Sequence, residues 1–348
     1  MGLQDKKEFT YSEAGVDREQ VSKILRDLKG KIRTTFNSRV LKDIGAFAGF
    51  YSLDPKEYRS PVLVSSMDGV GTKLKVAVMM NRHTTIGKDL VFHCVNDIAV
   101  HGAQSLFFLD YIAMGKLIPK VIEEIGEGLV AGCREAGCVL IGGETAEMPG
   151  VYQAGEYDLV GTMVGIVEQD KIIDGSKILP GDCLLGLASN GLHTNGYSLV
   201  RKLLFEEGKF SVNDYLPELN STMGEELLRV HRNYGNIIHR LLSQYPIRGM
   251  AHITGGGITE NLVRILPSGC RAVIYRGSWE IFPIFQLLQR LGNLSWGEMA
   301  RTFNLGVGMV LVVPAEEIES VREELKRAKE KCWVIGEITS GISAVEYK

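Results

Sequence analysis

Acidic residues beside glycines are the first sign of chemistry in this chain. Asp68 ends an apolar run and is followed by Gly69, Gly71, Thr72 and Lys73. Backbone N–H groups in a turn that opens a helix can bind phosphate, and a nearby carboxylate can hold Mg²⁺. The segment lacks the glycine spacing of a Walker A loop or a dinucleotide fingerprint. On these residues alone, a plain tight turn is an equally good interpretation.

A second group of polar residues falls on a predicted helix over residues 86–102. Asp89, His93, Asn96 and Asp97 recur at i, i+4, i+7 and i+8, so they share one face of the helix. The opposite face is apolar. An amphipathic helix that turns its polar side to water would give the same pattern. The short mixed stripe, which has no Lys/Glu pairs, favours a site instead.

Further carboxylates stand at or near predicted strands. Asp110 interrupts a strongly apolar run, where an unpaired acid is costly to bury. Glu144 and Glu147 follow a strand that closes on the pair Gly142-Gly143. Several carboxylates at element ends are what an Mg²⁺ site for nucleotide phosphates requires. The repetition of the pattern, rather than any one motif, predicts such a site.

The second half of the chain offers hydrogen-bonding loops. His193 lies in a segment, 189–198, that is dense in Ser, Asn and Thr, and this setting predicts a surface or site histidine rather than a core one. Gly255, Gly256 and Gly257 follow a predicted strand and can bind an anion through backbone amides. Residues 301–308, which include Asn304, read as a polar loop entering a strand. Four other histidines give no functional signal: His83, His101, His231 and His239.

These residues need a scaffold of alternating strands and helices. Apolar β-type runs and helical spacing alternate through both halves of the chain, which predicts an α/β (α+β) protein. The expected strands are 61–65, 105–114, 138–142, 157–167, 183–188, 250–254, 271–275 and 308–313, with helices over 86–102, 118–129 and 318–328. A polar stretch with turn signals, 168–182, predicts a boundary between domains 1–170 and 171–348.

Composition excludes several classes of protein. The 348 residues are 45% hydrophobic and 23% charged, which suits two globular domains. The net charge is only −3, so nothing predicts a nucleic-acid partner. The polar start, Met1–Thr10, does not resemble a signal peptide, and no apolar run approaches the roughly 20 residues of a membrane span. With six scattered cysteines, these features predict a cytoplasmic protein with reduced thiols.

Taken in order, the motifs resemble those of the aminoimidazole ribonucleotide synthetase family, the phosphoribosylformylglycinamidine cyclo-ligases. The resemblance covers nearly the whole chain, through segments 11–17, 68–73, 96–97, 107–111, 142–150, 193–198, 252–257, 260–261 and 301–304. It implies an N-terminal ATP-binding domain that pairs with its copy in a homodimer to form a shared β-barrel. It also implies a C-terminal α/β domain of the AIR-synthase-related superfamily.

The resemblance further implies a reaction and a set of site residues. Formylglycinamidine ribonucleotide would be cyclised to 5-aminoimidazole ribonucleotide, with ATP and Mg²⁺ as cofactors and ADP and phosphate released, in purine biosynthesis. Carried onto this sequence, the metal ligands would be Asp68, Asp97, Asp110, Glu144 and Glu147, and the nucleotide contacts Lys29, Gly69, Gly71, Thr72, Lys73 and Asn96. The ribonucleotide would face Asn195, Gly255, Gly256, Gly257 and Asn304, with His193 and Asp68 as the catalytic residues. Segment 34–37 (Thr-Thr-Phe-Asn) departs from the Lys/Arg-rich stretch of the family, so its role stays open.

Related enzyme classes fit the sequence less well. Selenide water dikinase needs a reactive Cys near the N-terminus, whereas the first here is Cys94. The hydrogenase maturation relative ends in a functional Cys, and this chain ends in Lys348. Thiamine monophosphate kinase is not expected to carry the His193 and 301–304 segments together. A catalytically silent ATP-binding regulator should have lost carboxylates from the metal set, and none is missing.

Overall fold

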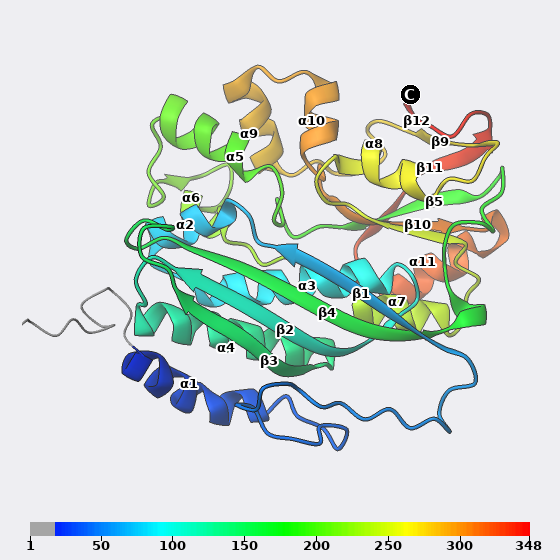
Figure 1. The fold of residues 1–348 in the computed structure, drawn as a ribbon. Coiled ribbons are helices and arrows are strands. Elements are labelled where there is room, and N and C mark those ends of the chain that lie inside the picture. The colour runs from blue at the N-terminus through cyan, green and yellow to red at the C-terminus, as the bar shows by residue number, and fades with distance from the viewer. Residues whose placement is uncertain (1–17) are drawn as a thin grey trace, which may run out of the picture.

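The computed structural model describes residues 18–348, so the motif at 11–17 lies outside the described residues. Two main sheets, each with helices packed on it, make up most of the fold (Figure 1). The first is four-stranded, in the order β1-β4-β2-β3, and only β2 and β3 run parallel. Its strands are β1 (Pro61–Gly69), β2 (Gln104–Met114), β3 (Val139–Glu147) and β4 (Tyr157–Glu168).

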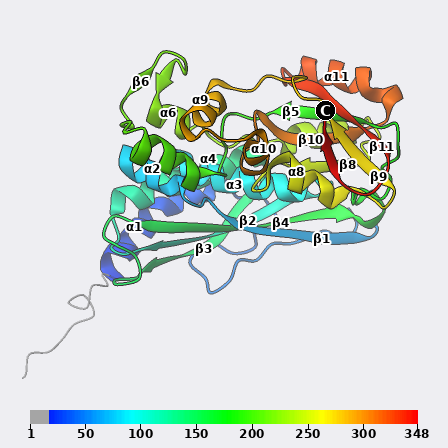
Figure 2. The same cartoon turned by 90° about the horizontal axis from the view of Figure 1, so that it is seen from above.

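Helices cover one face of this first sheet (Figure 2). They are α2 (Lys73–Met80), α3 (Thr84–Ala99) and α4 (Pro119–Ala136), and α1 (Arg18–Arg33) packs against α4. The helices α3 and α4 approach closely because glycines face each other between them. A Cβ added to Gly128 would stand 2.1 Å from the carbonyl oxygen of Thr84, and one on Gly87 would stand 2.4 Å from that of Ile125.

The second sheet has six strands in the order β12-β9-β11-β5-β10-β8. Its pairs are antiparallel except for β12 and β9. The strands are β5 (Cys183–Ala188), β8 (Gly249–His252), β9 (Cys270–Ile274), β10 (Val307–Val313), β11 (Cys332–Ser340) and β12 (Val345–Tyr347). Separate apolar clusters fill its two sides, one with α8 (Gly257–Leu262) and the other with α7 (Gly235–Leu242) and α11 (Ile318–Arg327).

Short elements between β5 and β10 extend the main core over α2. They contribute to the same apolar cluster as α3 and α4, which joins the two halves of the molecule. They are α5 (Tyr197–Arg201), the π-helix η2 (Lys202–Glu207), the hairpin β6 (Tyr215–Leu216) and β7 (Ser221–Thr222), α6 (Met223–Leu227), α9 (Pro283–Gly292) and α10 (Trp296–Thr302). Among residues 18–348, no helix has both the length and the apolar character to cross a membrane.

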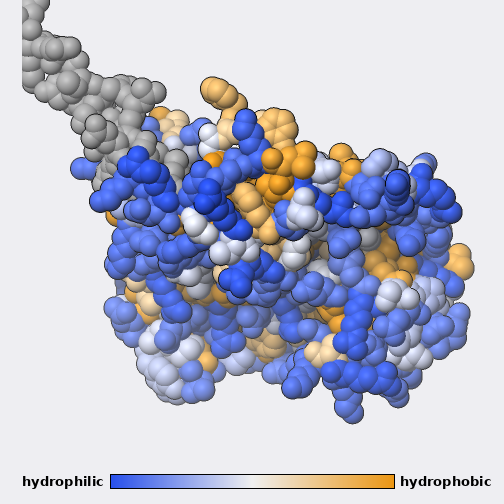
Figure 3. All heavy atoms as spheres, turned by 90° about the horizontal axis from the view of Figure 1, so that it is seen from below, coloured by the Kyte–Doolittle hydropathy of each residue, from blue (hydrophilic) through white to orange (hydrophobic). Residues whose placement is uncertain are grey.

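The face of the first sheet opposite the helices carries exposed apolar side chains. Ser66 and Asp68 of β1 contact α3, so alternation turns Leu63 and Met67 to the other side. There Leu63 is 60% exposed and Met67 is 70% exposed. The preceding loop adds the exposed Phe47 and Phe50. Seen from below, apolar residues gather on part of an otherwise mostly polar surface (Figure 3).

The predicted two-domain α/β architecture is confirmed, and most predicted strands lie within a few residues of the observed ones. The main differences are as follows. The helix α3 ends at Ala99 rather than at residue 102, and β3 continues through the glycine pair to Glu147. The strands β11 and β12 were not predicted. Backbone hydrogen bonding to β2 carries β3 past its glycines, because glycine weakens a strand without ending it.

Candidate active site

The polar face of α3 lies between the two halves of the molecule and not in water. Asp89, His93 and Asn96 are all buried. Asp97, one turn beyond His93, is partly exposed. These residues therefore do lie on one face of α3, as predicted, and that face contacts loops of the second half of the chain. The alternative of a water-facing stripe is wrong for this helix.

Two aspartates meet two histidines at this face. His93 Nε2 lies 2.8 Å from Asp68 Oδ2, and His252 Nδ1 lies 2.7 Å from Asp97 Oδ1. Ser66 Oγ donates to Asp97 Oδ2 at 2.8 Å. Burial opposes ionisation of Asp97, but the hydrogen bond and charge of His252 outweigh it and lower the pKa to about 2. Burial likewise opposes ionisation of Asp68, and His93 outweighs it, so this pKa is lowered too.

A chain of hydrogen bonds connects the two aspartates through the protein interior. His93 Nδ1 lies 2.9 Å from Thr194 Oγ1, and that hydroxyl lies 3.3 Å from His231 Nδ1. His231 Nε2 then lies 2.9 Å from His252 Nε2. With the two end pairs, five hydrogen bonds run from Asp68 to Asp97.

The number of hydrogens that these bonds require fixes how many imidazoles in the series are charged. Ionised carboxylates only accept, so five hydrogen bonds need five hydrogens. Three neutral imidazoles and one hydroxyl supply four, and the fully bonded chain therefore carries one imidazolium. Burial works against a charged His93, but the bond to Asp68 and the charge of Asp97 raise its pKa. Burial lowers the pKa of both His231 and His252, so the extra proton belongs on His93.

His193 joins the cluster without joining the chain of bonds. Its ring stacks on His231 with centroids 4.0 Å apart, and its backbone has a φ of 60°. Asn190 N donates to His193 Nε2 at 3.1 Å, which leaves the ring hydrogen on Nδ1. Within the part of the chain that the structure describes, that Nδ1 has no hydrogen-bond partner. Burial, followed by the neighbouring cations, holds the pKa of His193 well below its usual range, so the ring is neutral.

Lys73, a predicted phosphate contact, is fully buried in an ion pair. Its Nζ lies 2.9 Å from Asp89 Oδ1 and 2.8 Å from Asp89 Oδ2, and it donates to the carbonyl oxygen of Arg229 at 2.7 Å. His231 N also donates to Asp89 Oδ1, at 2.6 Å. Lys73 thus supports the segment that carries His231. A direct phosphate contact would require this ion pair to open.

Two predicted ligand-binding asparagines are hydrogen-bonded within the protein. Asn96 donates to the carbonyl oxygen of Arg232 at 2.7 Å and accepts from Tyr234 N at 2.8 Å. Asn304 donates to the carbonyl oxygen of Gly191 at 2.9 Å. It also accepts from Ser189 Oγ and Gly306 N. In this conformation the two amides fix the loops that hold His231 and His193.

The predicted glycine turns lie near this cluster and leave backbone accessible. Gly71 and Thr72 are exposed, and Thr72 Oγ1 lies 3.0 Å from Ser198 Oγ of the second half. A Cβ on Gly255 would stand 3.5 Å from Asn195 Oδ1. Asn261 Nδ2 holds the turn 255–257 by donating to two of its carbonyl oxygens. The structure thus brings Asn195 and the turn 255–257 together.

The remaining predicted metal ligands do not converge on Asp68 and Asp97. Asp110 and Asp68 both pair with Gly161 of β4, so β4 lies between them. Gly143 lies against Asp110, so alternation along β3 turns Glu144 to the other face. Glu147 accepts from Leu117 N at 2.9 Å. The three carboxylates separate because β3 continues as a strand where the sequence suggested a loop.

Asp110 should make stability depend on pH. Burial, with a further contribution from Glu144, raises its pKa to about 7. The unfolded carboxyl ionises near its ordinary pKa, so stability falls as pH rises from there to about 7, by at most about 1.4 kcal/mol per pH unit. Asp110→Asn removes this dependence. The free energy of unfolding of both proteins is measured in urea without divalent cations, at about pH 5 and about pH 8. The variant should become more stable relative to wild type at the higher pH. An equal change with pH in both proteins would contradict the prediction.

Lys29 lies in the last turns of α1, and segment 34–37 follows the C-terminal end of that helix. Lys29 Nζ is 2.8 Å from Asp43 Oδ2 in a partly exposed ion pair. Thr35 Oγ1 accepts from Leu140 N of β3 at 3.1 Å and donates to the carbonyl oxygen of Ile32. The atypical segment therefore has a structural contact, because Thr35 ties the end of α1 to the sheet.

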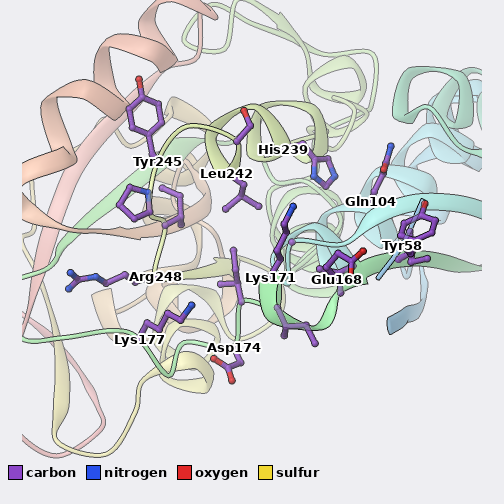
Figure 4. Close-up of a pocket in the computed structure, with 18 residues that line it drawn as sticks. Tyr58, Gln104, Glu168, Lys171, Asp174, Lys177, His239, Leu242, Tyr245 and Arg248 are labelled. Carbon is purple, nitrogen blue, oxygen red and sulfur yellow. The ribbon is translucent and has the colours of Figure 1, made fainter. Parts of the chain in front are cut away.

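Two cavities lie outside the histidine cluster. One, of about 440 Å³, lies between β4, α7 and the segment that joins β4 to β5. Lys171, Lys177 and Arg248 are among the residues that line it (Figure 4). No predicted site residue lines it. A second cavity, of about 280 Å³, is lined by Asn190 and Arg229 beside the His193 loop. The smaller cavity is thus the one that adjoins the predicted site.

Sequence reasoning missed the role of His231 and gave none to Thr194. His231 sits at the centre of the cluster, although its sequence context carries no motif. Two signals were present for its neighbours: His252 directly precedes the predicted anion-binding turn, and Thr194 lies beside His193. Only the packing of α3 against two separate loops and the end of β8 brings these residues together.

Comparison with known proteins gives the same family for both halves. Residues 53–167 match the family "AIR synthase related protein, N-terminal domain", and residues 180–348 match its C-terminal domain. A phosphoribosylformylglycinamidine cyclo-ligase of Geobacter metallireducens is 51% identical over 343 residues, or 98% of this chain and 99% of the relative. The one of Brevibacillus brevis is 48% identical over 97% of each chain.

Solved structures share the fold at low identity. Thiamine-monophosphate kinase from Stenotrophomonas maltophilia is 18% identical with a TM-score of 0.72, over 93% of this chain and 96% of that one. A hydrogenase maturation protein, HypE, solved in complex with ATP, is 16% identical with a TM-score of 0.66, over 94% and 90%. At these identities the likeness shows the fold alone.

Proposed function

The chain belongs to the phosphoribosylformylglycinamidine cyclo-ligase family, and from that premise we propose roles for its site residues. The protein is a ligase of purine biosynthesis that cyclises formylglycinamidine ribonucleotide to 5-aminoimidazole ribonucleotide and converts ATP to ADP and phosphate. The observation that carries the proposed roles is the meeting of Asp68 and Asp97 with histidines from both halves of the chain.

Asp68 and Asp97 suit the Mg²⁺ of a bound nucleotide. Both carboxylates reach the surface, with side chains 44% and 27% exposed, and both approach His93 Nε2, at 2.8 and 3.9 Å. Low pKa values keep both ionised, and carboxylate oxygens are the donors that Mg²⁺ prefers. When bound, Mg²⁺ would neutralise charge on the transferred phosphoryl group. Asp110, Glu144 and Glu147 were predicted with them, but they do not meet Asp68 and Asp97 in this conformation, so the proposed Mg²⁺ site rests on those two aspartates alone.

We place the nucleotide phosphates at the turn Gly69–Thr72, in which Gly71 and Thr72 are exposed. Gly71 and Thr72 present backbone there, whereas the buried Lys73 and Asn96 support the neighbouring loops. We propose that Lys29 also contacts the nucleotide, after its ion pair with Asp43 opens. The ATP complex of the hydrogenase maturation protein supports nucleotide binding on this fold.

The chemistry requires a better leaving group and a proton acceptor. The formyl oxygen takes the γ-phosphoryl group, the amidine nitrogen then attacks the same carbon, and the C–O bond breaks to release phosphate. The nitrogen must lose a proton as the ring closes. His193 is proposed to take part in this proton transfer once the hydrogen bond from Asn190 N to its Nε2 opens, because Nε2 is the ring nitrogen without a hydrogen. Asn195 and the turn Gly255–Gly257 would orient the ribonucleotide, with Asn304 holding the His193 loop in place.

A coupled assay tests the assignment as a whole. Purified protein is incubated with formylglycinamidine ribonucleotide, ATP and Mg²⁺, and 5-aminoimidazole ribonucleotide and ADP are measured together. We expect the two products in equal amounts and no product without divalent cation. ADP without ring closure would indicate another phosphotransfer reaction of this fold. Turnover that needs no divalent cation would contradict the proposed metal site.

We also propose a homodimer and the division into domains 1–170 and 171–348. The apolar face that carries Leu63 and Met67 has the character of a sheet that packs on its copy. The domain division is supported by the end of β4 at Glu168 and the start of β5 at Cys183, with turns between them.

Charges on the open sheet face should separate the dimer. With Leu63→Glu and Met67→Glu together, dimerisation should weaken by about 100-fold or more, because unpaired carboxylates would be buried in the interface. Light scattering across a dilution series measures the change. Ile342→Glu is the control, since Ile342 is 74% exposed in the second half of the chain. A monomeric wild type, or a double variant that dimerises normally, would contradict the proposal.

A further inference from the structure

Three side chains of the histidine cluster are arranged as metal ligands. His93 and Asp97 stand one turn apart on α3, and His252 ends β8. One ligand atom from each lies within 4.8 Å of the other two. The closest pair is His252 Nδ1 with Asp97 Oδ1, at 2.7 Å. Asp97 thus stands between two imidazole nitrogens that point toward it from different elements.

The outer nitrogens of both imidazoles are fixed by hydrogen bonds. His93 Nδ1 meets Thr194 Oγ1 at 2.9 Å, and His252 Nε2 meets His231 Nε2 at 2.9 Å. Thr194 and His231 are themselves hydrogen-bonded. Metal-binding histidines are characteristically held in this way, because the outer bond sets ring orientation and tautomer. To bind a metal, His93 would release its extra proton, and the hydrogens of His231 and His252 would shift so that His93 Nε2 and His252 Nδ1 each offer a lone pair.

We propose that His93, Asp97 and His252 bind one borderline transition-metal ion, of which Zn²⁺ and Co²⁺ fit best. Two imidazole nitrogens and one carboxylate favour such ions, whereas Mg²⁺ selects oxygen ligands. Asp97 is 27% exposed and gives the ion a path to the site. Asp68, at 2.8 Å from His93 Nε2, can supply an oxygen as the fourth ligand or accept a hydrogen bond from a bound water.

This site has a consequence for catalysis that rests on the proposed function. Asp97 is also assigned to the Mg²⁺ of the nucleotide, so one ion would exclude the other from it. Zn²⁺ should then inhibit turnover, and a higher concentration of Mg²⁺ and ATP should relieve the inhibition. Binding of the transition metal itself does not depend on the identity of the substrate.

Cobalt binding tests the site without a turnover assay. Chelator-treated full-length protein is titrated with Co²⁺ alone, followed by visible absorption and calorimetry. We expect one ion per chain, with the spectrum of cobalt bound to nitrogen ligands, and displacement by Zn²⁺. His252→Gln should weaken binding by about 100-fold, and His231→Phe, which removes the outer bond, by about 10-fold. His239→Gln is the matched control and should bind as wild type does.

Thermal unfolding of every variant shows whether a loss of binding reflects a loss of fold. If His252→Gln unfolds, Asp97→Asn and His93→Gln are used in its place. Absence of a stoichiometric site in folded wild type would overturn the proposal, and so would unchanged affinity in a folded ligand variant. Failure here with normal Mg²⁺-dependent turnover would leave the proposed function standing. Cobalt binding without ring closure would support the transition-metal site and contradict the proposed function.

Discussion

Asp68→Asn should reduce turnover by about 100-fold or more while the protein stays folded. The carboxylate of Asp68 lies 2.8 Å from His93 and is proposed to hold the nucleotide's Mg²⁺. Asparagine keeps the size and one acceptor oxygen but removes the charge that balances a cation and the imidazolium on His93. The side chain is 44% exposed, so the loss of charge should affect chemistry more than stability.

The measurement is initial-rate kinetics across a range of Mg²⁺ and ATP concentrations, with unfolding curves for the same preparations. A lower kcat together with a higher Mg²⁺ requirement supports a metal ligand. Asp170→Asn is the control, because Asp170 is an exposed aspartate in a surface ion pair with Arg59. A variant that turns over normally would remove Asp68 from the metal site.

Truncation of Lys73 to alanine should destabilise the protein by about 3–5 kcal/mol. Lys73 and Asp89 are each 0% exposed, and no solvent can replace the lost ammonium. Burial lowers the pKa of Lys73 and raises that of Asp89, while their mutual attraction opposes both shifts. Without Lys73, Asp89 retains His231 N as a donor but becomes a buried charge without a counterion.

Equilibrium urea unfolding measures this loss. The paired variant Lys73→Met with Asp89→Leu should recover much of it, because no unpaired charge remains. Glu218→Ala is the control: it breaks an exposed pair with Arg290 and should cost less than about 1 kcal/mol. A Lys73→Ala protein within about 1 kcal/mol of wild type would show that the buried pair does not hold this region.

Local sequence pattern determined most of the strands and, within the site, Asp68 and Asp97. Apolar β-type runs predicted β1, β2 and β4, and helical spacing put His93 and Asp97 on one face of α3. Hydrophobic period and turn chemistry act over a few residues, so they can be read without the fold. The ordered motifs also pointed to the cyclo-ligase family, which the close relatives confirm.

Only the tertiary structure decided which of these residues meet. His231 has no motif, yet packing places it against His193 and His252. Glu144 has a motif, yet the pleat of β3 turns it away from Asp110. Such contacts join residues far apart in the chain, and they depend on sheet register and on how α3 packs between the two halves. No local pattern encodes those quantities, because each is set by the whole core at once.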